Sequence, residues 1–405
     1  MILNQLGIVC ALGDHGEQVW QRACNGESPG MHTCDLSVAD SPNLIAGHVD
    51  DTCLPALAEL PKHHATRNNQ LAAAALAQLM PSIERCKAKF GAERVGVIIG
   101  TSTSGIREGE AAIRHYDATQ ALPENFHYSM QEMTAPADFI AEYTGVQGPC
   151  YSISIACSSS ARALISAQAL LAAQQVDAVI VGGVDSLCRL TLNGFHALES
   201  TALARTLPFS QQRDGINIGE AAALFIATRE PLDATLPQVS LSGFGHSSDA
   251  YHMTAPEPQG RGAQDAMQQA LRRAQLSPAE ISYVNLHGTG TPLNDAMEAQ
   301  AVTACGLATT PASATKALTG HTLGAAGAVE AALCWLALQQ NDGRLPLHVY
   351  DGVYDPELPQ LQLVTKASKV AVRHCLSNSF AFGGNNVSLI FSLAAAMETA
   401  HASIS

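Results

Sequence analysis

Short runs of apolar residues, rich in Val and Ile, recur along the chain, and each is bounded by Gly, Asn or Asp. Continuous runs of this length are typical of strands that are covered on both faces. The pattern predicts strands at residues 94–100, 177–184, 222–227, 281–286 and 386–391. A further apolar run opens the chain, and no Lys or Arg precedes Arg22. A secretory signal needs a basic N-terminal region, so this run predicts a buried first strand instead.

Between these runs, apolar residues return with the spacing of helices. Helices are predicted at residues 69–79, 135–143, 158–174, 263–275, 295–305 and 322–339. Strands that alternate with helices in this way indicate an α/β architecture of layered helices and sheets.

Three features occur in the same order in both halves of the chain. A buried strand runs into a Gly-Thr turn near residues 100 and 290, and a strand, a polar turn and a helix of small residues follow near 157 and 321. A closing strand lies near residues 224 and 388. The shared order predicts a duplicated α/β unit with its join at 228–237, which we place between an N-terminal half, 1–232, and a C-terminal half, 233–405.

Composition and charge narrow the classes of function. The chain has 405 residues, of which 47% are hydrophobic and 14% charged, as expected for a well-buried globular protein of more than one core. A formal net charge of −14 argues against nucleic acid or an anionic membrane surface as the main partner. No apolar run is long enough to span a bilayer, so we expect a cytoplasmic protein with no membrane partner.

The eleven cysteines are scattered and include no CxxC pair. Disulfide frameworks and zinc sites both need organised spacings, so we expect neither, and no metal site. Most of these cysteines should be small buried residues in a reducing compartment. A functional role for any one of them therefore needs support from its local context.

Cys157 has such a context in the segment SISIACSSSARAL. The first residues predict a strand and those after Cys157 predict a helix, so the thiol lies at a sharp turn beside a helix N-terminus. The partial positive charge there should stabilise the thiolate and lower the pKa of the thiol. Backbone N–H groups at the same turn can bind an oxyanion. We therefore expect Cys157 to be a nucleophile.

Two histidines occupy matching places in the C-terminal half. His287 directly follows a predicted buried strand, and His321 precedes the second helix of small residues. Together they predict a set in which Cys157 holds an acyl group and two imidazole N–H donors stabilise an enolate formed by loss of carbon dioxide. Lys316 and Glu330 are interpreted as a mutually satisfied pair that supports this set. The alternative is that both are exposed surface charges, which fits Glu330 better than Lys316. The chemistry requires no metal and no other cofactor.

The segment SNSFAFGGNN, residues 377–386, joins a strand to the closing strand through Gly383 and Gly384. These glycines permit positive φ or a close approach of the backbone. Phe380 and Phe382 are interpreted either as the wall of an acyl pocket or as core aromatics. No GxxxxGK[ST] motif occurs, so nucleotide hydrolysis is poorly supported.

Five ordered motifs resemble the elongating β-ketoacyl-acyl-carrier-protein synthases of type II systems, within the thiolase-like superfamily. They are ACSSSA around Cys157, RDGINIGEAAA at 213–223, NLHGTGTPLND at 285–295, SATKALTGHTLGAAGAVEA at 313–331 and SNSFAFGGNN at 377–386. The resemblance covers nearly the whole chain. It implies an αβαβα layered fold, a dimer and the condensation of an acyl group with malonyl-loaded acyl carrier protein.

The resemblance also assigns roles to single residues. It implies Cys157 as nucleophile, His287 with His321 as the decarboxylation pair, and Lys316 with Glu330 as supporting charges. The backbone N–H groups of Cys157 and Phe382 match the family's oxyanion hole, and Phe380 matches a gating aromatic. The residues assigned to substrate binding are Phe380, Phe382, Thr289, Thr291 and Gly383.

Some positions depart from the family pattern. Ala381 and Asn385 stand where members usually have Gly and Thr, beside the expected pocket. Lys62 and Arg67 fall in one region where carrier protein docks, but no Lys or Arg occurs between Arg114 and Arg162, where another basic patch is expected. A paralogous ketosynthase-like subunit could supply that surface, so the dimer is either a homodimer or a heterodimer.

These departures leave alternatives open. We expect a specialised type II pathway, for example an aryl-polyene-like pathway, and the alternative is a housekeeping fatty-acid elongation synthase. A non-catalytic partner subunit of a ketosynthase heterodimer is a hypothesis of another class, which the intact Cys-His-His set disfavours. A thiolase acting on coenzyme A substrates is disfavoured because its second cysteine near the C-terminal glycines is missing.

Overall fold

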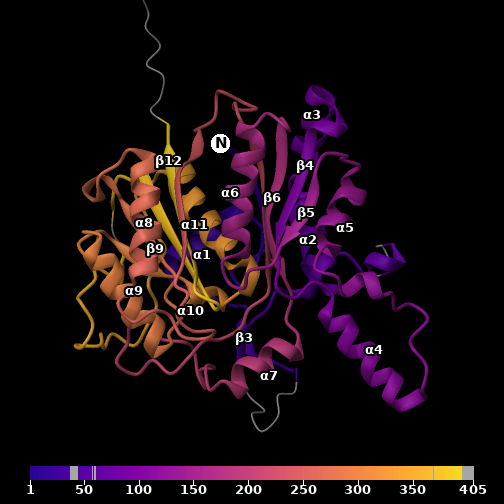
Figure 1. The fold of residues 1–405 in the computed structure, drawn as a ribbon, viewed down its shortest axis with the longest axis horizontal. Coiled ribbons are helices and arrows are strands. Elements are labelled where there is room, and N and C mark those ends of the chain that lie inside the picture. The colour runs from indigo at the N-terminus through magenta and orange to yellow at the C-terminus, as the bar shows by residue number, and fades with distance from the viewer. Residues whose placement is uncertain (37–43, 57, 59–60, 368, 395–405) are drawn as a thin grey trace, which may run out of the picture.

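The computed structural model describes residues 1–36, 44–56, 58, 61–367 and 369–394. Figure 1 shows helices and strands in alternating layers. The strands are β1 (Ile2–Val9), β2 (Met31–Thr33), β3 (Ile45–Gly47), β4 (Val95–Gly100), β5 (Cys150–Ile153), β6 (Ala178–Asp185), β7 (Ala221–Thr228), β8 (Val239–Ser248), β9 (Tyr283–Leu286), β10 (Ala312–Ala314), β11 (His374–Ala381) and β12 (Asn385–Leu393). The α-helices are α1 (Gly16–Asn25), α2 (Arg67–Ala77), α3 (Met80–Phe90), α4 (Ile106–Thr119), α5 (Ala135–Thr144), α6 (Ser159–Ala172), α7 (Arg189–Ala197), α8 (Arg261–Ala274), α9 (Pro292–Ala304), α10 (Lys316–Thr319) and α11 (Ala326–Gln340).

The order of the strands repeats. The large sheet of the described residues runs β10-β9-β11-β12-β8-β1-β7-β6-β4-β5. Read from its two edges, it consists of β10-β9-β11-β12-β8 and β5-β4-β6-β7-β1, in which each strand of one half has a counterpart at the same place in the other. A short antiparallel pairing of β1 with β8, at Leu3 and Val239, joins the two halves. This repeated order accounts for the sequence features that recur near residues 100 and 290, 157 and 321, and 224 and 388.

Two helices form the central layer. α6 and α11 pack against each other, and each contacts strands of both halves of the sheet. Small residues let these elements approach closely, and they share the largest hydrophobic cluster with inward-facing strand residues. α2 and α5 cover the outer face of the N-terminal half, and α8 and α9 lie over the C-terminal half, each side with its own apolar cluster. The result is the five-layered αβαβα arrangement of a thiolase-like fold.

Most predicted elements are confirmed within a few residues. The predicted helix at 322–339 differs, because Leu323 has a φ of +53°, in the left-handed region, and the segment 323–325 forms a short 3-10 turn. The α-helix α11 therefore begins only at Ala326. Five α-helices were not predicted: α1, α3, α4, α7 and α10. The division at residue 232 lies between β7 and β8, and it stays a prediction. Among the described residues, no helix is long and apolar enough to cross a membrane.

Candidate active site

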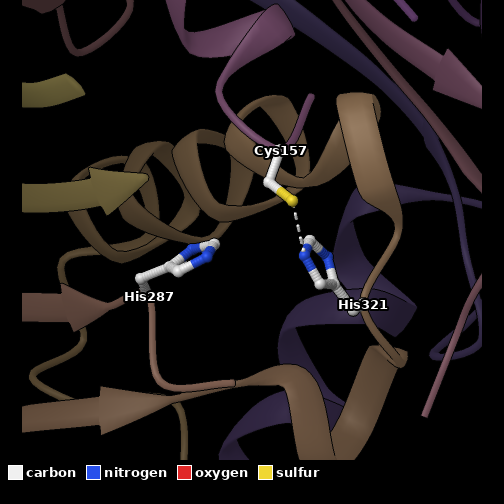
Figure 2. A group of neighbouring side chains, drawn as sticks. All are labelled: Cys157, His287 and His321. Atoms are coloured by element: carbon white, nitrogen blue, oxygen red, sulfur yellow. Dashed lines mark hydrogen bonds between the residues drawn. The ribbon is translucent and has the colours of Figure 1, made fainter. Parts of the chain in front are cut away.

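The turn between β5 and α6 holds Cys157 in a buried position inside the molecule. Ala156, directly before it, has a φ of +52°, which an L-residue adopts only under local strain. This sharp turn directs the thiol away from its own strand. His287 follows β9, and His321 lies between α10 and the turn before α11. All three side chains are buried, and Figure 2 shows them facing one another across the join of the two halves.

His321 contacts the thiol directly. Its Nε2 atom lies 3.0 Å from Sγ of Cys157 (Figure 2). The backbone N–H of Leu323 donates to its Nδ1 atom at 3.2 Å. Nδ1 is therefore an acceptor, and in a neutral ring the proton lies on Nε2. Burial lowers the pKa of His321, and the charge of Lys316 acts in the same direction, so the ring is a neutral donor aimed at the sulfur.

His287 has the same tautomer for a different reason. The ammonium of Lys316 donates to Nδ1 of His287 at 3.1 Å and also to its backbone oxygen. This leaves the proton of the neutral ring on Nε2, which is free to face a substrate. Burial is the main cause that lowers the pKa of His287, followed by the charge of Lys316. The two imidazole rings lie 5.5 Å apart and are nearly perpendicular.

Lys316 and Glu330 form an ion pair in which both side chains are buried. The predicted mutual pairing is thus confirmed, and the reading of Glu330 as an exposed charge is wrong. Burial raises the pKa of Glu330 to about 7, against the opposing charge of Lys316. The pair holds the ammonium at the site where it donates to His287.

The pKa of Cys157 differs from the expectation. Burial raises the pKa of the thiol to about 11, although the charge of Lys316 and backbone N–H groups of Phe382 and Cys157 lower it. The expected lowering at a helix N-terminus is therefore outweighed by loss of solvent around the sulfur. Both N–H groups thus face the sulfur, as the oxyanion hole expected from the family resemblance requires.

The three side chains also have the donor types of a metal site. Their ligand atoms lie within 4.8 Å of one another. However, a metal needs the Nε2 lone pairs, and each Nδ1 already accepts a hydrogen bond that keeps the proton on Nε2. Metal binding here would break both of these hydrogen bonds, so the arrangement suits proton donation better than ligation.

Glu298 is a buried carboxylate on α9 that the sequence analysis missed. It accepts the backbone N–H groups of His287 at 2.8 Å and Gly288 at 2.7 Å, and the side-chain amide of Asn378 at 3.2 Å. These bonds fix the backbone that carries His287. Burial raises the pKa of Glu298 to about 7. The signal in the sequence was its spacing of three from Asp295, which puts both carboxylates near one face of the helix.

Asp185, at the end of β6, was also missed. Its Oδ1 accepts from the hydroxyls of Thr101 and Thr103 and from the backbone N–H groups of Ser102 and Thr103, all at 2.7–2.8 Å. Its Oδ2 accepts the N–H of Ala325 at 3.2 Å. One carboxylate thus ties the loop after β4 to the turn that holds His321. The signal in the sequence was an Asp at the end of a run of buried, apolar strand residues.

A cavity of about 300 Å³ opens onto the reacting atoms. Its lining includes Cys157, His287, His321, Phe380, Phe382, Ala381, Thr289 and Thr291. The ring centroids of Phe380 and His287 lie 6.1 Å apart, and those of Phe382 and Phe195 lie 5.5 Å apart. Gly383 is not part of the lining, and its N–H donates to the carbonyl of Met253 at 2.8 Å. Of the residues assigned to substrate binding, Gly383 therefore lies outside the cavity.

The predicted docking role of Arg67 is wrong. Its guanidinium is buried and donates to Glu220 at 2.6 Å, to Asp51 at 2.5 Å and to the carbonyl of Val49 at 3.0 Å. A cation held by two carboxylates adds no free positive charge to the surface. Lys62 is exposed and remains available.

Comparisons with known proteins place the chain among ketosynthases. It matches the β-ketoacyl synthase N-terminal domain over residues 6–231 and the β-ketoacyl synthase C-terminal domain over residues 239–347. The 3-oxoacyl-[acyl-carrier-protein] synthase 2 of Rhizobium meliloti is 30% identical over 96% of this chain and 98% of that protein. The synthase of the same name from Synechocystis is 29% identical over 96% of this chain and 97% of that protein.

Solved structures of similar fold agree with this family match. A chain in the structure of the ketosynthase ApeO in complex with its chain length factor ApeC, from Xenorhabdus doucetiae, is 44% identical, with a TM-score of 0.91. The match covers 97% of this chain and 98% of that chain. A β-ketoacyl synthase from Burkholderia phymatum is 25% identical, with a TM-score of 0.79 over 97% of this chain and 99% of that chain.

Proposed function

This chain belongs to the β-ketoacyl synthase family of acyltransferases, and we propose that it is a β-ketoacyl-acyl-carrier-protein synthase. The proposed reaction is a decarboxylative Claisen condensation, which extends an acyl chain on Cys157 by the two carbons that remain of a malonyl group. One observation carries the proposal. In a single cavity, Sγ of Cys157 lies 3.0 Å from the Nε2–H donor of His321, and a second Nε2–H donor, that of His287, lies beside it.

The first step loads the acyl chain. Sγ of Cys157 attacks the carbonyl carbon of an acyl-carrier thioester, so a new C–S bond forms and the bond to the carrier sulfur breaks. The thiol proton leaves with the carrier thiol. The Nε2–H of His321 stabilises the developing thiolate, and the N–H groups of Cys157 and Phe382 stabilise the oxyanion.

The second step removes carbon dioxide from a malonyl thioester. The Nε2–H groups of His287 and His321 donate to the thioester oxygen. The carbon–carbon bond to the carboxylate breaks and carbon dioxide leaves. The electron pair of that bond stays on the remaining fragment as the enolate, which the two donors stabilise. Two neutral donors suit this step, because neither histidine has to lose its proton.

The third step joins the two groups. The enolate carbon attacks the acyl carbonyl on Cys157, so a carbon–carbon bond forms and the C–S bond breaks. The sulfur takes up one proton from solvent, and the β-ketoacyl chain leaves on the carrier. The N–H groups of Cys157 and Phe382 again face the oxyanion.

We place the enzyme in a specialised, aryl-polyene-like type II pathway, in preference to housekeeping fatty-acid elongation. The chain is 44% identical to a chain of the ketosynthase–chain length factor complex from Xenorhabdus doucetiae, and only 29–30% identical to the 3-oxoacyl-[acyl-carrier-protein] synthases 2. Ala381, which replaces the family's usual Gly, lines the cavity and adds a methyl group beside the acyl site.

The same complex supports a heterodimer with a paralogous chain length factor, and acyl carrier protein is the second partner. This subunit offers few cations for the docking of an acidic carrier protein. No Lys or Arg lies between Arg114 and Arg162, and Arg67 is buried in an ion pair. The eleven cysteines are free thiols, which suits the reducing cytoplasm that we propose as the location.

The test is acylation by a panel of acyl-loaded carrier proteins, saturated, polyunsaturated and aryl-primed, read by intact mass with and without a co-expressed paralogue. We expect selective acylation of Cys157 by the conjugated or aryl primers. Acylation by saturated chains alone would favour fatty-acid elongation. Absence of acylation in every combination would favour a non-catalytic subunit.

Two controls separate reaction from binding. Cys157→Ala should lose acylation, and the matched variant Cys53→Ala, at a partly exposed thiol outside the cavity, should keep it. His287→Ala should acylate but fail to release carbon dioxide from malonyl-carrier. Full condensation by Cys157→Ala would show that the proposed mechanism is wrong.

A further inference from the structure

A second cluster of potential ligands lies on the surface. His63 and His64 are neighbours in the short 3-10 helix η3 (Lys62–His64), and Glu142 lies on α5. The Nε2 atoms of His63 and His64 lie 3.3 and 3.2 Å from the same oxygen, Oε2 of Glu142. None of the three lines the cavity around Cys157. Two imidazoles and one carboxylate are donors that Zn²⁺ binds in proteins.

The spacing of the donors fits a small tetrahedral ion. Zinc lies about 2.0–2.2 Å from nitrogen and oxygen ligands, so neighbouring ligands around a tetrahedral ion are about 3.3–3.5 Å apart. The two observed nitrogen–oxygen separations, 3.3 and 3.2 Å, agree with this value, and all three donor atoms lie within 4.8 Å of one another. Little movement is needed to place an ion between them.

The backbone of η3 holds the two rings in place. The N–H of His64 donates to the carbonyl of Pro61 at 2.8 Å, and the side-chain amide of Asn69 donates to the carbonyl of His64 at 3.0 Å. The ring of His64 is buried and packs edge-on against Phe139 of α5, with 5.4 Å between the ring centroids. His63 and Glu142 are about half exposed, at 47% and 53%, so an ion can enter from solvent.

The histidines of this cluster differ from those of the active site. In the described part of the chain, Nδ1 of His64 is buried and has no hydrogen-bond partner, so no donor forces it to act as an acceptor. The proton of the ring can therefore move to Nδ1, and the Nε2 lone pair becomes available to a metal. Nδ1 of both His287 and His321 already accepts a hydrogen bond.

We propose that His63, His64 and Glu142 form a binding site for a divalent transition-metal ion, with Zn²⁺ the best match and water in the fourth position. A bound ion joins η3, which leads into α2, to α5, which covers the edge strand β5 (Figure 1). Because the ion binds the folded chain, it stabilises this corner of the molecule. The proposal does not depend on the proposed condensation.

The test uses the full-length protein without a polyhistidine tag, stripped of metal and titrated with Co²⁺ and then with Zn²⁺. We expect one tight site with the visible absorption of Co²⁺ bound by nitrogen and oxygen, and displacement of Co²⁺ by Zn²⁺. A cobalt–thiolate charge-transfer band in the near ultraviolet would place the ion at a cysteine, such as Cys157 or the partly exposed Cys53 and Cys150, and would overturn the proposal.

Variants at the exposed ligands locate the site without disturbing the core. His63→Ala and Glu142→Gln should each lower the affinity for the metal ion at least about ten-fold. Replacing even a residue that only hydrogen-bonds to a metal ligand lowers metal affinity by that factor. They should also lose the rise in melting temperature that Zn²⁺ gives the wild type. His115→Ala is the matched control, because it removes an exposed histidine of α4 outside the cluster. Wild-type affinity in both ligand variants, or no metal binding by the wild type, would refute the site.

Discussion

Two hydrogen bonds determine which nitrogen of each active-site histidine carries the proton. A backbone N–H, that of Leu323, serves His321, and a side chain, Lys316, serves His287. Only a change to proline would remove the backbone donor, whereas any uncharged side chain at position 316 removes the ammonium. The two histidines are therefore separable by experiment, because only His287 depends on another side chain for its tautomer.

Lys316→Met should lose malonyl decarboxylation while Cys157 still accepts an acyl group. Without the ammonium, Nδ1 of His287 can take the proton and Nε2 no longer donates to the thioester. The variant should also lose about 3–5 kcal/mol of the free energy of unfolding, because the buried carboxylate of Glu330 loses its partner. Release of carbon dioxide from malonyl-carrier and urea denaturation measure the two effects.

The double variant Lys316→Met/Glu330→Leu distinguishes catalysis from folding. It replaces both charges by apolar side chains, so most of the lost stability should return. Decarboxylation should stay low, because the donor to His287 is still missing. If activity returned together with stability, Lys316 would be a structural residue only.

The raised pKa of Cys157 predicts how its reactivity changes with pH. The thiolate is the nucleophile, and burial raises the pKa of the thiol to about 11. Below that value the thiolate fraction increases with pH, so alkylation of Cys157 by iodoacetamide should become about ten-fold faster per pH unit between pH 7 and pH 9. Peptide mass spectrometry follows the modified residue, and Cys157→Ala gives the background. A plateau near pH 8 would contradict the raised pKa.

At the level of elements, the position of Cys157 depends on how closely α6 approaches β4. A Cβ atom added at Gly100 of β4 would lie 2.2 Å from the backbone nitrogen of Ser160, in the first turn of α6. The hydroxyl of Ser160 accepts the N–H of Ala328 at 2.9 Å and so links α6 to α11. The start of α6 is thus held between a strand and the second central helix.

Gly100→Ala should therefore displace the first turn of α6 and the thiol before it. Overpacking against backbone costs about 1–3 kcal/mol, and acylation should slow at least about ten-fold, because small shifts of a reacting atom are costly. Gly194→Ala in α7 is the control, since nothing lies within 4 Å of the added atom, and it should stabilise the helix slightly. Normal acylation by Gly100→Ala would show that the thiol tolerates movement of α6.

On the scale of the whole molecule, the site exists because two similar halves face each other. The N-terminal half supplies Cys157 and the carboxylate of Asp185, and the C-terminal half supplies both histidines and Lys316. The halves share one apolar core around α6 and α11, and the indole of Trp335 donates to the carbonyl of Leu3 across the join at 2.9 Å. The shared core fixes the distance between the thiol and the imidazoles.

A chain cut between the halves should remain one active unit. Residues 234–236 lie in an exposed loop between β7 and β8, where a protease recognition sequence can be inserted. After cleavage, the two pieces should elute together in gel filtration and should still acylate Cys157, because the common core holds them. Separation of the pieces in native buffer would mean that the covalent link, and not the core, joins the halves.

The sequence allowed most of the strands and central helices to be predicted, because buried strands and helices of small residues leave a periodic record. Helices α1, α3, α4, α7 and α10 were nevertheless missed. The left-handed turn at Leu323 left no record, since a Leu gives no sign of positive φ. Arg67 was misread for a related reason. Its burial depends on Glu220 and Asp51, and Glu220 lies far away in the chain.

By itself, the sequence determined which residues are the candidates for the chemistry: a thiol and two imidazoles beside turns at matching places in two repeated units. Only the tertiary structure decided how those groups behave. Which nitrogen holds a proton, whether the thiol is solvated, and which carboxylates support the loops all depend on neighbours from distant segments, such as Lys316 beside His287 and Glu298 beneath it. Local pattern records the faces of single elements, but hydrogen-bond partners and burial arise only when those elements pack.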